Sequence, residues 1–122
     1  MTKFLGLGRL KKMSVLDIAN TLSDEIKKSK EYVDFKEIRE KINSDPELKS
    51  KIEQFEKMRY NEQILAIQQN NQNEDGIRKL QEIYQILMQD EIIKDYFDKQ
   101  VKFNVLIADV NKIIGNAIKD VL

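Results

Sequence analysis

The feature that most constrains this chain is the apolar pattern of its last stretch, residues 90–122. From Phe103 onward, the apolar residues of this pattern are separated by four, three, four, three and four positions. This spacing is typical of a helix that packs along its length against other helices. Read as a helix, the stretch places on one stripe Ile93, Phe97, Phe103, Ile107, Val110, Ile114, Ala117 and Val121.

The composition favours the same kind of fold. Charged residues make up 34% of the 122 residues and hydrophobic residues 41%, with four Gly and one Pro. Such a composition is typical of amphipathic helices, and the length is that of one domain. We therefore predict an all-α fold: an elongated bundle of about four to five amphipathic helices with a long C-terminal helix.

Capping signals mark where the helices begin. Ser14 with Asp17 forms the pattern of a capping box before apolar residues at helical spacing, which are Val15, Ile18, Ala19, Leu22 and Ile26. Asp45 before Pro46 is a natural N-cap, and Asp90 repeats that role before the last helix. The break near Ser29 leaves open whether residues 15–43 form one kinked helix or two. The polar residues 68–75 are predicted to be a connector.

Several kinds of chemistry are excluded by the residue types. The chain has no Cys and no His, which rules out disulfides, thiol nucleophiles and imidazole ligands or bases. Its acidic clusters have Lys or Arg three or four residues away, as on a solvated helix face. Phosphate-binding glycine motifs are absent. We predict that the protein is not an enzyme, and we expect no catalytic residues, cofactor or metal.

Charge and hydropathy bound the partners and the location. The 21 basic and 21 acidic residues cancel, so the whole chain is not steered toward nucleic acid or an anionic membrane. No run approaches the roughly 20 apolar residues of a membrane span, and a secretory signal is not recognisable, so we expect a cytoplasmic protein without membrane insertion.

Residues 1–13 are interpreted as a basic N-terminal extension, and disorder is one expectation for it. The alternative is a basic arm that touches a membrane surface or RNA. Residues 14–122 are then expected to form a single helical domain.

Self-association is the predicted use of the apolar stripes. A few long helices in a chain of this size cannot easily cover each other's apolar faces, so we expect a homo-oligomer, with a dimer as its simplest form. Whether the C-terminal stripe packs within its own chain or against a second copy stays open. Gly115 within this helix is expected to permit a close backbone approach or a bend. The predicted interaction surface consists of Phe103, Ile107, Val110 and Ile114.

Strings spread over the chain resemble the YlbF/YmcA family of small helical bacterial proteins, to which the YheA-like proteins are related. The strings are SKEYVDF at 29–35, SDPEL at 44–48 followed by Phe55, QDE at 89–91 with Tyr96, and FNVLIADVNKII at 103–114. Their order and spacing carry the resemblance, which covers about residues 15–118.

The resemblance implies an oligomer-forming helical adaptor or regulator. Its implied partners are YlbF/YmcA-type proteins and a ribonuclease complex, with roles in competence, sporulation, biofilm formation and RNA processing that depends on RNase Y. Some complexes of this type hold iron–sulfur clusters on cysteines, which this Cys-free chain cannot do. Two alternatives remain: an accessory protein that contacts RNA, and a YheA-like paralogue of unknown role.

Overall fold

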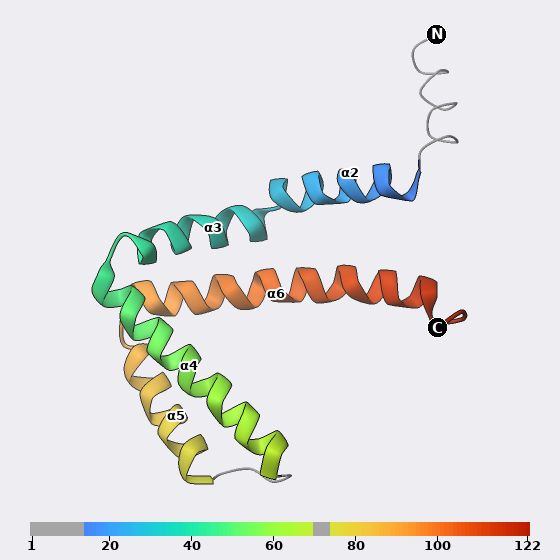
Figure 1. Ribbon diagram of the computed structural model, residues 1–122. Helices are drawn as coiled ribbons and strands as arrows, with labels where there is room; N and C mark the ends of the chain where they lie inside the picture. Colours follow the sequence, from blue (N-terminus) through green and yellow to red (C-terminus); the bar gives the residue numbers. More distant parts are fainter. Residues whose placement is uncertain (1–13, 70–73) are drawn as a thin grey trace.

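The computed structural model describes residues 14–69 and 74–122, and these residues fold into five α-helices (Figure 1). The predicted all-α fold is confirmed, and its long C-terminal helix is present with 28 residues. The basic extension predicted for residues 1–13 lies outside the described residues, as does part of the polar connector. The helices are α2 (Val15–Lys28), α3 (Lys30–Asn43), α4 (Pro46–Gln69), α5 (Glu74–Leu87) and α6 (Glu91–Ile118).

Residues 15–43 form two helices, because Ser29 serves both as the end of α2 and as the start of α3. The Ser29 backbone is extended, with φ −65° and ψ 149°. Its hydroxyl donates a hydrogen bond to the Ile26 carbonyl (2.6 Å) and accepts one from the Tyr32 N–H (3.2 Å). One side chain thus satisfies a free carbonyl of α2 and a free N–H of α3.

The other helix starts follow the predicted caps. Ser14 and Asp17 form the reciprocal capping box at the start of α2. The Oδ1 atom of Asp45 accepts hydrogen bonds from the N–H groups of Glu47 (3.1 Å) and Leu48 (3.3 Å). Asp90 repeats this arrangement before α6. These local contacts fix the boundaries of the helices before tertiary packing is considered.

The helices are arranged as two arms that meet at an elbow (Figure 1). In one arm α3 packs along the first half of α6, and in the other α4 and α5 form a helical hairpin. The α2 helix extends from α3 away from the elbow, in the same general direction as the second half of α6. No helix in the described part of the chain combines the length and apolar character that crossing a bilayer requires.

The buried core of the described residues lies at the elbow. It joins four helices, and Ile93 at the start of α6 is its most buried side chain, with 1% exposed. Aromatic rings pack within it: Phe55 lies edge-on to Phe97 with the ring centroids 5.8 Å apart. The core side chains are Ile38, Ile42, Leu48, Ile52, Phe55, Leu87, Ile93, Tyr96 and Phe97.

Candidate interaction surface

The surface farthest from the elbow exposes apolar side chains of both α2 and α6. On α2, the exposed fraction is 82% for Val15, 55% for Ile18 and 36% for Leu22. None of the residues of α2 is buried. On α6, Ile114 is 48% exposed. We call this surface the open end, and define it by Val15, Ile18, Leu22, Ile107, Val110 and Ile114.

The C-terminal stripe passes from the core into the open end without a break. Ile93 and Phe97 are buried at the elbow, Ile107 and Val110 are half-buried, and Ile114 is exposed. The apolar stripe of α6 thus has different surroundings in the two halves of the helix. The first half of α6 is covered by its own chain, and the apolar face of the second half is left partly uncovered.

Phe103 stands at the transition between these two parts. Its ring lies 5.6 Å from that of Phe35, in a stacked arrangement, and 6.1 Å from that of Tyr32. Of the four residues predicted as an interaction surface, Phe103 thus has packing partners within the chain. The assignment of all four to an interface stays a prediction.

Because α2 is short and its apolar face is exposed, packing against another surface would stabilise it. It has only 14 residues, and isolated helices shorter than about 12–15 residues are marginal in water. Most helix stability in proteins comes from packing of the apolar face, and the face of α2 is largely uncovered. The apolar spacing of α2 was visible in the sequence, but only the structure shows that its own chain leaves this face exposed.

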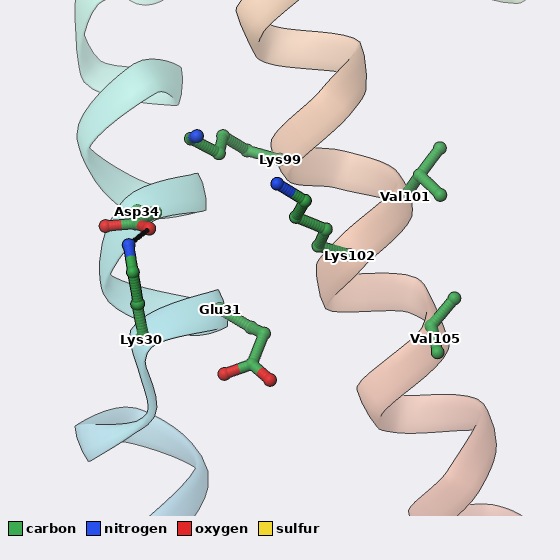
Figure 2. A pocket seen from close by; sticks show the side chains of 7 residues that line it. All are labelled: Lys30, Glu31, Asp34, Lys99, Val101, Lys102 and Val105. Carbon is green, nitrogen blue, oxygen red and sulfur yellow. Dashed lines mark hydrogen bonds and ion pairs between the residues drawn. The ribbon is translucent and has the colours of Figure 1, made fainter.

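A charged groove of about 440 Å³ lies between α3 and α6 on the way to the open end (Figure 2). Figure 2 shows Lys99 and Lys102 directed from α6 toward α3, while Val101 and Val105 point to the other side. The residues that line it are Lys30, Glu31, Asp34, Lys99, Val101, Lys102 and Val105.

The lysines of this groove already have acidic partners within the chain. Lys30 pairs with Asp34, Lys99 lies 3.4 Å from Asp95, and Lys102 lies 3.1 Å from Asp98. The hydrogen bond from Lys30 holds the pKa of Asp34 below its ordinary value, and the nearby charges of Lys99 and Lys102 act in the same direction. The groove is therefore a solvated ion-pair network, and its lysines are not held ready for an anion.

Two further observations limit the chemistry of this surface. Within the described residues, no group of three or more acidic side chains is placed to hold a metal ion. A Cβ atom added at Gly115 would meet no heavy atom within 4 Å. The close backbone approach expected at Gly115 is thus not made within the described part of this chain.

Comparison with known proteins agrees with the resemblance of the sequence. Residues 15–119 match the family model described as control of competence regulator ComK, YlbF/YmcA. UPF0342 protein STH1710 of Symbiobacterium thermophilum is 33% identical over 102 residues, which cover 84% of this chain and 91% of the relative. A UPF0342 protein of Caldicellulosiruptor bescii is 31% identical over 106 residues, covering 87% of this chain and 89% of that protein.

A solved structure shares the fold. A chain in the crystal structure of Bacillus subtilis RicA in complex with RicF superposes with a TM-score of 0.56. The match covers 87% of this chain and 94% of the other, at 18% sequence identity. The helical arrangement is thus found in a protein that was crystallised together with a protein partner.

Proposed function

The chain belongs to the YlbF/YmcA family, and from this premise we propose that it is a non-enzymatic cytoplasmic adaptor that acts by assembling with other helical proteins. The observation that carries the proposal is the open end, where two helices with defined ends expose apolar stripes. A second copy of the chain is the first partner that we propose for this surface.

The apolar burial available at the open end is of the same size as the cost of association. Fully burying a Val, Leu or Ile side chain contributes about 1.5–3 kcal/mol. Burying what Val15, Ile18, Leu22 and Ile114 expose would contribute roughly 3–7 kcal/mol per copy, and twice that in a symmetric dimer. Association costs about 4–15 kcal/mol in lost freedom, so the two terms are comparable. A single charge placed in this surface should then be enough to separate the copies.

Light scattering coupled to size-exclusion chromatography tests the proposed assembly. The wild-type protein should elute as a dimer at micromolar concentration, whereas Ile18→Asp and Ile114→Asp should elute as monomers that still unfold cooperatively. Ile86→Asp is the matched control, because Ile86 is 66% exposed on α5 in the other arm. A monomeric wild-type protein, or variants that all remain dimeric, would overturn the assignment of the open end.

We further propose that the cellular role is that of a YlbF/YmcA-type complex, with effects on competence, sporulation, biofilm formation and RNase Y-dependent RNA processing. The family description, which names control of a competence regulator, supports this role, as does the fold shared with RicA. Affinity capture of the tagged chain from its native cells should recover a YlbF/YmcA-type protein or a ribonuclease. Capture of neither would favour a paralogue with a separate role.

A further inference from the structure

A second surface, separate from the open end, carries two arginines that lie over aromatic rings. The guanidinium carbon of Arg39 on α3 lies 5.7 Å from the ring centroid of Phe35, and that of Arg59 on α4 lies 5.7 Å from the ring centroid of Phe55. Both arginines are exposed, and neither forms an ion pair with a described carboxylate. Two basic side chains on α6, Lys99 and Lys102, are in the opposite situation, since both are paired with acids.

Tyr96 connects the two arginines into one surface. Its ring lies 5.7 Å from that of Phe35, and its hydroxyl donates a hydrogen bond to Glu56 (3.3 Å) and accepts one from Gln100 (3.4 Å). Burial, followed by the charge of Glu56, raises the pKa of Tyr96, and the charges of Arg39 and Arg59 both oppose that rise. Tyr96 thus contacts both helices that carry these arginines: Phe35 lies one turn before Arg39 on α3, and Glu56 lies one turn before Arg59 on α4.

Each arginine stands at the rim of a hollow with aromatic walls. One hollow, of about 360 Å³, is lined by Tyr32, Phe35, Arg39 and Phe103 among others. The other, of about 530 Å³, is lined by Phe55, Arg59, Leu80 and Tyr84 among others. An arginine without a described ion pair thus lies beside a hollow with aromatic side chains twice, and we call these two hollows together with Tyr96 the arginine–aromatic face.

We propose that the arginine–aromatic face binds an acidic peptide segment of a partner protein. Carboxylates of the segment would pair with Arg39 and Arg59, whose planar guanidinium groups donate two parallel hydrogen bonds to a carboxylate. Apolar side chains between those carboxylates would enter the two hollows. Arginine and aromatic residues next to each other are also the side chains that most often dominate protein–protein binding.

The geometry favours a peptide over RNA. Stacking of a base requires a free ring face, but Phe35 has Phe103 stacked against it and Arg39 over its ring. Apolar side chains of a peptide need no such free ring face, and the first hollow, which Lys36 also lines, offers them space beside Arg39.

Fluorescence anisotropy with a labelled synthetic peptide tests this proposal. The probe is a short peptide of Glu and Asp with one central Phe and one Leu, and the two comparison probes are the same peptide with Lys at the acidic positions and an oligouridine of equal length. The acidic peptide should bind, and added salt should weaken it, while the other two probes should not bind. Absence of binding by the acidic peptide, or preference for the oligouridine, would overturn the proposal.

Variants locate the binding on the molecule. Arg39→Gln with Arg59→Gln should weaken the acidic peptide by about tenfold or more, because two charged pairs are lost. Arg78→Gln is the matched control, since Arg78 is an exposed arginine on α5 that is already paired with Asp75 at 3.0 Å. Equal affinity of the double variant and the wild type would refute the site. Neither substitution lies in the open end, so the mass from light scattering should stay unchanged and separates this proposal from the proposed assembly.

Discussion

The substitution Ile93→Ala tests whether the elbow is the part of the molecule that holds the two arms together. Ile93 is 1% exposed and lies in the first turn of α6, where its N–H donates a hydrogen bond to the Asp90 cap (3.2 Å). Its side chain belongs to the core cluster in which α3, α4, α5 and α6 meet. Deleting it removes contacts to more than one helix at a single point.

The expected loss of stability follows from the atoms removed. Ile→Ala deletes three carbons, and each buried CH₂ group contributes about 0.8 kcal/mol, which gives roughly 2.4 kcal/mol for transfer alone. The remaining cavity adds to this, so we expect a loss of about 3–4 kcal/mol, within the 2–5 kcal/mol measured for such substitutions. Against a typical stability of about 5–15 kcal/mol, this is a large fraction.

Urea unfolding followed by far-UV circular dichroism measures this difference. All variants are compared at one protein concentration, because any association contributes to the apparent stability. Ile86→Ala is the matched control: it deletes the same atoms from a side chain that is 66% exposed, and should change stability by no more than about 0.5 kcal/mol. If Ile93→Ala loses no more than Ile86→Ala, the elbow is not the main core and the reasoning fails.

Four further substitutions follow from the same structure. Asp90→Ala removes the cap of α6 and should lower the unfolding free energy by about 0.5–2 kcal/mol in urea titrations. Gly115→Ala adds a methyl group where a helix has open space, and should raise the unfolding free energy by about 0.5–1 kcal/mol. If this variant instead loses the dimer in light scattering, Gly115 lies against a second copy. The hydrogen bond from Lys102 lowers the pKa of Asp98 in the folded state. Ionised Asp98 therefore contributes to stability above its ordinary pKa of 3.8, and this contribution is lost as the pH falls. In Asp98→Asn the melting temperature should decline less steeply in acid. The pKa of Tyr96 is raised by burial, so stability should fall as the pH rises past the ordinary value of 10.0, and Tyr96→Phe should reduce that fall in alkaline melting curves.

Local signals predicted most of the helices. Ser14, Asp45 and Asp90 cap helices in the structure as the sequence indicated, because an N-cap acts over only three residues. The apolar spacing also identified the buried faces near the elbow, such as Ile93 and Phe97. Both kinds of signal depend on neighbours in the sequence and need no knowledge of the fold.

The surroundings of each stripe could not be predicted in the same way. Apolar spacing shows which face of a helix avoids water, but not which element covers it. The apolar residues between positions 103 and 114 are regularly spaced, yet Phe103 packs on α3 while Ile114 is 48% exposed. Arg39 and Phe35 are one helical turn apart, so their contact could be predicted from the sequence, whereas the contact of Phe35 with Tyr96 depends on how α3 and α6 pack.

The position of the two proposed surfaces follows from the packing of α3 on α6. Phe103 lies between the two: its ring lines the hollow beside Arg39, and the apolar stripe of α6 continues from it toward Ile107 and Ile114 in the open end. A partner at the open end would therefore press on the same helix that forms one wall of the arginine–aromatic face. Because tightly packed side chains transmit small displacements, binding at the open end should affect the first hollow, next to Phe103, more than the second hollow on the α4–α5 hairpin.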